Sequence, residues 1–120
     1  MIPYARQDIT QDDINAVTEV LQSDWLTQGP MVERFENAVS SYANSKYAVA
    51  VNSATSALHI ACLALGVKPN DWVWTSPNTF VSSANCAIYC GAKVDFVDID
   101  PQTYNISVSQ LEIKLKKAEV

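Results

Sequence analysis

The segment Asn52–Ser56 places small hydroxyl and amide residues where an apolar strand, 47–51, is expected to run into a helix. Four apolar residues predict that helix by the i, i+3, i+4, i+7 spacing of one buried face: Leu58, Ala61, Cys62 and Leu65. The first turn of a helix has unpaired backbone N–H groups and a partial positive charge, so it can bind a phosphate group. Thr55 and Ser56 add hydroxyl groups there. The alternative is that Ser53 or Thr55 only caps the helix.

A second polar segment, Thr75–Thr79, lies at the end of the next predicted strand and leads directly to Phe80. Residues 47 to 99 read as strand, helix, strand, helix and strand, with the strands at 47–51, 72–76 and 93–99. Short connections of this kind imply right-handed crossovers and a parallel sheet covered by helices. Ligands of such α/β sheets gather at the carboxyl ends of the strands. The two polar segments are therefore the candidate functional sites.

The other helices are predicted from their start and stop signals. Thr10–Asp13 opens a first helix with acidic residues in its first turn, and this helix is expected to fade by Ser23. Pro30 suits the first turn of a second helix, whose apolar stripe reaches Tyr42. Three further boundaries are expected: Gly66 ending the helix after Ser56, a helix from Asn78 or Thr79 to Gly91, and a capping box at Ser109 for a last helix through Lys117.

Composition bounds the class of protein. The chain has 120 residues, 48% of them hydrophobic, and a net charge of −5. This length fits one small domain, and the acidic balance argues against nucleic acid or an anionic membrane as a partner. No apolar run is long enough for a transmembrane helix, and the first residues lack the pattern of a secretory signal. Three cysteines without a C-x-x-C pair indicate reduced thiols in a cytoplasm.

Several other kinds of chemistry lack their residues. Only three glycines occur, so the glycine-rich loops of dinucleotide- and ATP-binding folds are missing. His59, the single histidine, is expected inside a helix, which favours a structural role over a hydrolase triad. Asp95 should point outward from its strand, and Asp100 begins an Asp-Pro turn, so these carboxylates and Asp98 are interpreted as solvated. The cysteines fit core packing better than a metal site: Cys62, Cys86 and Cys90.

Four segments together resemble the pyridoxal 5'-phosphate (PLP)-dependent sugar aminotransferases of the DegT/StrS family. They are DWLTQGP at 24–30, NSATSALH at 52–59, SPNTFV at 76–81 and VDFVDID at 94–100. Their order and spacing also fit, and the resemblance covers nearly the whole chain. The opening Ile2-Pro3-Tyr4 and the run 26–30 favour one subgroup. Its members aminate C4 of a UDP-linked 4-keto-6-deoxy-N-acetylhexosamine in pseudaminic acid biosynthesis.

The resemblance implies an α/β fold, the N-terminal part of the large domain of a fold type I PLP-transferase. Its mostly parallel sheet would be incomplete and flanked by helices. Residues 1–46 would supply the N-terminal helices and a segment for substrate and dimer contacts. Residues 47–120 would supply the β-α units, and the remainder of the enzyme lies outside this sequence.

The resemblance also implies roles for individual residues. Ala54, Thr55 and Ser56 would bind the PLP phosphate, and Phe80 would stack on the pyridine ring. A further set would approach the nucleotide sugar, in either subunit of a homodimer: Tyr4, Asp24, Trp25, Leu26 and Thr27. The alternative for Trp25 and Leu26 is a hydrophobic clamp on the following helix.

No lysine of this sequence matches the family's Schiff-base lysine, which the family supplies from a segment further along the chain. The chain alone is therefore expected to be an inactive N-terminal piece. The full-length cytoplasmic enzyme would use PLP to move an amino group, by family default from glutamate, to the UDP-sugar. Three alternatives remain open: a sugar dehydratase of the same fold with histidine in place of the lysine, a non-catalytic binding module or truncated remnant, and an unrelated nucleotide-binding α/β domain, which the missing glycine-rich loop opposes.

Overall fold

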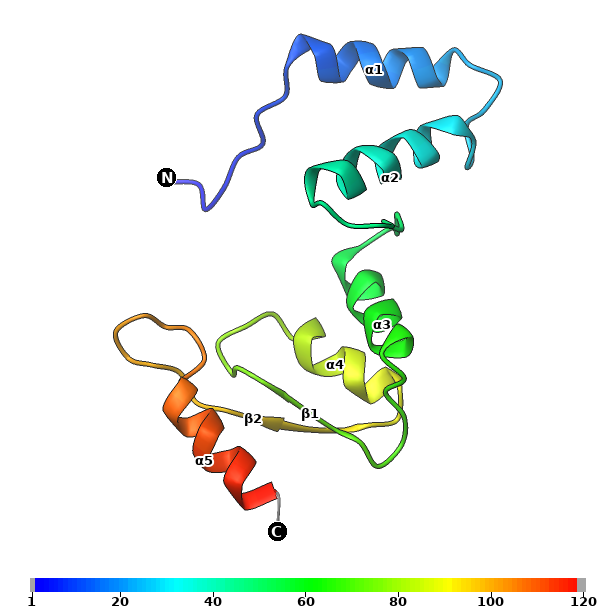
Figure 1. The fold of residues 1–120 in the computed structure, drawn as a ribbon. Coiled ribbons are helices and arrows are strands. Elements are labelled where there is room, and N and C mark those ends of the chain that lie inside the picture. The colour runs from blue at the N-terminus through cyan, green and yellow to red at the C-terminus, as the bar shows by residue number, and fades with distance from the viewer. Residues whose placement is uncertain (1, 119–120) are drawn as a thin grey trace. The chain divides into compact units, whose positions relative to one another are not determined.

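The computed structural model describes residues 2–118 and divides into two compact units, one ending at Ala50 and one beginning at Val51 (Figure 1). Within residues 2–118, no helix is both long and apolar enough to cross a membrane.

The first unit begins with a capped helix, α1, Gln11–Leu21. The Thr10 hydroxyl accepts a hydrogen bond from the Asp13 N–H at 3.4 Å, and the Asp13 carboxylate accepts one from the Thr10 N–H at 2.7 Å. This reciprocal pair is a capping box, which satisfies two otherwise unpaired donors at the helix start. The predicted start is confirmed, and the helix ends before Ser23, as expected.

Helix α2, Pro30–Tyr42, follows with Pro30 in its first turn, as the sequence predicted. The strand predicted at 47–51 is wrong, because these residues take no strand conformation in the structure. A strand is held by a ladder of hydrogen bonds to a neighbouring strand. Within residues 2–118, segment 47–51 has no such neighbour, and the Ala50 N–H donates instead to the Glu36 carboxylate at 2.8 Å.

The second unit contains the sheet. Helix α3, Ala54–Ala64, leads through Gly66 to strand β1, Trp72–Thr75, and helix α4, Ser82–Tyr89, leads to strand β2, Lys93–Phe96. The two strands pair in parallel, with Trp72 opposite Lys93 and Thr75 opposite Phe96. The parallel pairing is confirmed, and two of the three expected strands form among the described residues. Helix α4 packs against both strands and against α3 (Figure 1).

Helix α4 begins at Ser82, later than the predicted start at Asn78 or Thr79. The Asn78 N–H donates to the Ser76 hydroxyl at 3.2 Å, which folds the chain around Pro77 into a turn before the helix. The turn competes with helical hydrogen bonds for the same backbone group. Segment 76–81 therefore remains a loop at the end of β1.

Helix α5, Val108–Ala118, begins one residue earlier than the predicted cap at Ser109. Ser107 caps it instead: its hydroxyl accepts from the Gln110 N–H at 3.4 Å, and its carbonyl accepts from the Leu111 N–H at 2.9 Å. The Ser107 N–H donates to the Asp98 carbonyl at 2.8 Å. This hydrogen bond across the preceding loop holds Ser107 where the helix has to start.

Small residues form the core of the second unit, between α4 and its neighbours: Ala84, Cys86, Ala87, Ala92 and Val97. All three cysteines are free, and the packing role expected for Cys86 is confirmed by its burial. Burial and the neighbouring thiols of Cys86 and Cys90 raise the pKa of the Cys62 thiol to about 11. His59 packs edge-on against the Tyr89 ring at 5.3 Å, in line with the structural role expected for it.

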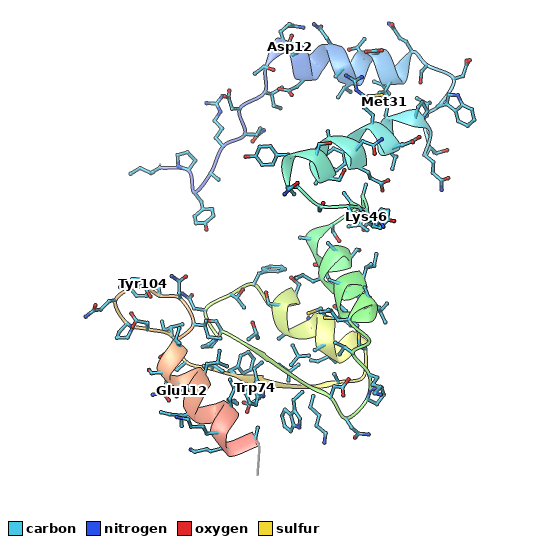
Figure 2. The ribbon with its side chains drawn as sticks, viewed as in Figure 1. Asp12, Met31, Lys46, Trp74, Tyr104 and Glu112 are labelled. Atoms are coloured by element: carbon cyan, nitrogen blue, oxygen red, sulfur yellow. The ribbon has the colours of Figure 1, made fainter. Side chains whose placement is uncertain are left out.

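Asp95 and Asp100 have different surroundings. The Asp100 carboxylate accepts from the N–H groups of Gln102 and Thr103, both at 2.9 Å, which confirms the predicted turn. The Asp95 side chain is 49% exposed, in line with the solvated position expected for it, and its carboxylate also forms an ion pair with Lys114 of α5 that the sequence did not predict. The same ammonium donates to the Phe96 carbonyl at 2.7 Å and lies 5.1 Å from the ring of Trp74, which Figure 2 labels. Lys114 thereby ties α5 to the sheet.

The Asp95 contact predicts an acid-dependent loss of stability. The hydrogen bond from Lys114 lowers the pKa of Asp95 below its usual value. A carboxyl with a lowered pKa in the folded state stabilises the fold above its unfolded pKa of about 3.9 and loses that effect as the pH falls further. Asp95→Asn should therefore flatten the change in unfolding free energy below about pH 4 in urea titrations of the full-length protein. If the unfolding free energy of Asp95→Asn fell as steeply with decreasing pH below about 4 as that of the wild type, this would contradict the prediction. Asp8→Asn, at an exposed position, is the control.

Candidate active site

The start of α3 is the first candidate binding element. Ser53 is its extended N-cap, and its hydroxyl accepts from the Ser56 N–H at 3.2 Å. The Ser56 hydroxyl donates to the Asn52 side-chain oxygen at 2.8 Å. The capping interpretation is thus confirmed for Ser53 and not for Thr55. Asn52 was part of the candidate segment, but its hydrogen bond to Ser56 was not predicted, because that contact exists only in the folded turn.

Capping leaves part of this helix start available. Within residues 2–118, no protein group accepts a hydrogen bond from the N–H groups of Ala54 and Thr55 or contacts the Thr55 hydroxyl in one. These three donors lie at the positive end of the helix, where an anion is stabilised. Ser56 differs, because its hydroxyl proton is already engaged by Asn52. The turn therefore fits a phosphate group through Ala54 and Thr55 more directly than through Ser56.

Phe80 lies in the loop between β1 and α4, in the same unit as α3. Its side chain is 73% exposed, so the ring is not part of the core of the described structure. Helices α3 and α4 pack side by side (Figure 1), and the two candidate elements lead into these neighbouring helices. An exposed ring in this place is free to stack on a flat ligand.

The residues expected near the sugar lie in the first unit. Tyr4 is fully exposed, and Asp24, Trp25, Leu26 and Thr27 form the connection between α1 and α2. The Trp25 N–H donates to the Ser23 hydroxyl at 3.2 Å. Trp25 also lies against Gly29, since a Cβ added at Gly29 would be 2.9 Å from the Trp25 Cβ. That contact places Trp25 beside the residue before α2, but Trp25 is 61% exposed, so the clamp interpretation and the role of all five residues at the sugar stay predictions.

Three lysines of the second unit have partners in the structure. Lys114 is paired with Asp95, Lys116 with Glu112 at 2.7 Å, and Lys93 lies 5.5 Å from the ring of Trp72. These contacts lie within α5 or between α5 and the strands, or beside the ring of Trp72.

Within residues 2–118, no group of three or more His, Cys, Asp or Glu residues is arranged to hold a metal ion.

Comparison with known proteins identifies the family. The profile of the DegT/DnrJ/EryC1/StrS aminotransferase family matches residues 7–119. The chain belongs to this family. The resemblance drawn from the four sequence segments is confirmed, and DegT/DnrJ/EryC1/StrS proteins use pyridoxal phosphate.

Two curated proteins are close in sequence to this chain. The UDP-4-amino-4,6-dideoxy-N-acetyl-beta-L-altrosamine transaminase of Campylobacter jejuni subsp. jejuni serotype O:23/36 is 47% identical over 117 residues, covering 98% of this chain and 31% of that protein. The spore coat polysaccharide biosynthesis protein SpsC of Bacillus subtilis (strain 168) is 47% identical over 111 residues, covering 92% of this chain and 28% of SpsC. The chain spans less than a third of the length of either relative.

Solved structures are similar to this chain as well. The putative sugar aminotransferase Spr1654 from Streptococcus pneumoniae, in its PLP form, matches with a TM-score of 0.86 and 34% identity over 93% of this chain and 29% of that chain. Its PMP form gives the same TM-score. The chain therefore has an α/β structure that corresponds to part of fold type I, as expected from the sequence.

Proposed function

We propose that the full-length protein transfers an amino group from glutamate to the C4 keto group of a UDP-linked 6-deoxy-N-acetylhexosamine, in pseudaminic acid biosynthesis. The observation that carries the proposal is the 47% identity to the Campylobacter jejuni transaminase over 98% of this chain. We further propose a cytoplasmic homodimer in which Tyr4 and segment 24–27 approach the nucleotide sugar. We propose neither a membrane nor a nucleic acid as a partner.

Two sets of the described residues would bind PLP. The N–H groups of Ala54 and Thr55 and the Thr55 hydroxyl would hold the phosphate group, with Ser56 in support through its hydroxyl after release from Asn52. Phe80 would lie against the pyridine ring, fix its plane and exclude water from one face. PLP supplies the chemistry of amino transfer by stabilising negative charge on the carbon that exchanges its proton. The residues of this chain would bind PLP and orient it.

The proposal is tested with the purified full-length protein, glutamate and a UDP-4-keto-6-deoxy-N-acetylhexosamine. The 4-amino sugar should form together with 2-oxoglutarate, detected by mass spectrometry. Loss of a sugar hydroxyl without consumption of glutamate would identify a dehydratase and contradict the proposal. Absence of any turnover of the nucleotide sugar by PLP-loaded protein would contradict it as well.

Phe80→Leu should separate cofactor stacking from core packing. Stacked aromatic pairs contribute about 0.5–1.5 kcal/mol beyond area burial, so PLP binding should weaken about two- to tenfold and the absorbance band of the bound cofactor should shift. The melting temperature of the apoprotein should stay nearly constant, because the ring is exposed. Phe96→Leu, on β2, is the matched control for loss of a ring elsewhere. A loss of about 3 kcal/mol or more in apoprotein stability would make Phe80 a core residue instead.

A further inference from the structure

A hollow of about 380 Å³ lies at the carboxyl end of β1 in the second unit. One wall is the segment that leaves β1, with Thr75, Ser76, Asn78 and Thr79. The other wall is the loop between β2 and α5, through Tyr104–Ile106. Figure 2 labels Tyr104 on that loop. The carboxyl end of a parallel strand is the usual place for ligands of an α/β sheet.

The loop 98–107 is held in shape by its own hydrogen bonds. Ile99 and Ile106 form an antiparallel bridge, the Asp100 N–H donates to the Asn105 carbonyl at 2.8 Å, and the Tyr104 N–H donates to the Asp100 carbonyl at 2.8 Å. These contacts keep Tyr104 at φ +59°, a left-handed conformation that is unfavourable for a residue with a large side chain. The wall of the hollow is therefore built in advance of any ligand, and the Tyr104 side chain, 65% exposed, stands at its margin.

The lining has no charged side chain. Its polar groups are hydroxyls and the amides of Asn78 and Asn105. Within residues 2–118, both side-chain amides lack a hydrogen-bond partner, since only the backbone N–H groups of these two residues bond to nearby hydroxyls. An amide donates and accepts, as a sugar hydroxyl does, and a tyrosine ring can cover the apolar face of a sugar. This chemistry suits a neutral, hydroxyl-rich ligand and not a diphosphate.

We propose that this hollow binds the hexose ring of the nucleotide sugar, with Asn78 and Asn105 bonding to its hydroxyls or N-acetyl group and Tyr104 lying along the ring. The inference rests on the proposed function, in which the hexose carbon C4 must meet the cofactor. Segment 75–79 continues directly into Phe80, so the part of the substrate held here is the part next to the cofactor. The uncharged lining leaves the diphosphate and uridine outside the hollow.

The test uses the full-length PLP enzyme and three variants. Asn105→Ala removes one free amide. Tyr104→Asn removes the ring, and Asn tolerates the left-handed backbone. Asn105→Ala and Tyr104→Asn should each raise KM for the UDP-4-keto sugar about tenfold, which corresponds to about 1.4 kcal/mol of binding free energy. Conversion of PLP to its amine form by glutamate, followed by absorbance without any sugar present, should be unchanged. Gln102→Ala, in the same loop and outside the hollow, is the matched control and should leave both measurements unchanged.

The outcomes separate this inference from the proposed function. If the wild-type enzyme aminates the sugar and both variants keep its KM, the hexose does not bind here and the inference is overturned. If the variants slow the glutamate half-reaction as much as the sugar half-reaction, or lower the melting temperature of the apoprotein by several degrees, the hollow serves the fold and the inference is also overturned. If the wild-type enzyme fails to aminate any UDP-4-keto sugar, the proposed function itself is wrong.

Discussion

Thr55→Val should weaken PLP binding to the full-length protein by about ten- to a hundredfold. Valine keeps the shape of threonine and removes one hydroxyl. A hydrogen bond to a charged group contributes about 1.5–3 kcal/mol, and each 1.4 kcal/mol is tenfold in affinity. The helix itself should be unaffected, because Ser53 and not Thr55 accepts the capping hydrogen bond. Affinity is measured by titrating apoprotein with PLP and following the absorbance of the bound cofactor.

Two serine variants serve as controls for Thr55→Val. Ser53→Ala removes the cap, so it should lower stability by about 1 kcal/mol with a smaller effect on the bound phosphate. Ser56→Ala should weaken PLP binding less than Thr55→Val, because the Ser56 hydroxyl already donates to Asn52. Unchanged retention of PLP by Thr55→Val after dialysis would remove Thr55 from the phosphate site. A larger effect at Ser56 than at Thr55 would show that the hydrogen bond to Asn52 breaks when the cofactor binds.

Gly29→Ala should cost more stability than any other alanine substitution at a glycine of this chain. Gly29 precedes α2 at φ +82° and ψ −174°, a region almost reserved for glycine, where other residues cost about 1–3 kcal/mol. An added Cβ would also lie 2.9 Å from the Trp25 Cβ, which is too close for two carbon atoms. Both effects act in the same direction, so the unfolding free energy should fall by about 2 kcal/mol or more.

Gly66→Ala is the matched comparison for Gly29→Ala, measured in the same urea titrations of the full-length apoprotein. Gly66 has a similar φ of +76°, but an added Cβ would meet nothing within 4 Å. Its substitution should therefore carry only the backbone strain, about 1–2 kcal/mol. Equal losses for the two variants would show that Trp25 does not press on Gly29, and the clamp interpretation of Trp25 would lose its support.

The boundaries that were predicted correctly depend on neighbours in the chain. The capping box of Thr10 and Asp13, Pro30 in a first turn, and Gly66 and Gly91 with positive φ after helices are all decided within a few residues. Hydrogen bonds of this range form wherever the local sequence permits them. Parallel pairing also followed from sequence, because short connections through α4 allow little else.

The start of α4 was mispredicted because of a local turn between Ser76 and Asn78, but the other wrong predictions depended on partners further along the chain. Segment 47–51 has the apolar character of a strand, but a strand exists only beside another strand, and none pairs with it within residues 2–118. The start of α5 was misplaced because Ser107 is fixed by the carbonyl of Asp98, nine positions earlier. The ion pair of Asp95 was not predicted, because its partner, Lys114, lies on a helix that the strand pattern does not reveal.

The candidate site divides in the same way. Residue types at the start of a predicted helix pointed to Thr55 and Ser56, and the resemblance to the family pointed to Phe80; their roles at the cofactor stay predictions. Only the folded structure distinguished the free hydroxyl of Thr55 from that of Ser56, since Asn52 engages one and not the other. Only the folded structure also brought Tyr104 and Asn105 opposite Asn78, because that meeting requires β2 to pair with β1 and the loop after β2 to fold back on itself. Competition for hydrogen bonds and pairing of distant segments exist only in the folded chain, so they could not be predicted from the sequence alone.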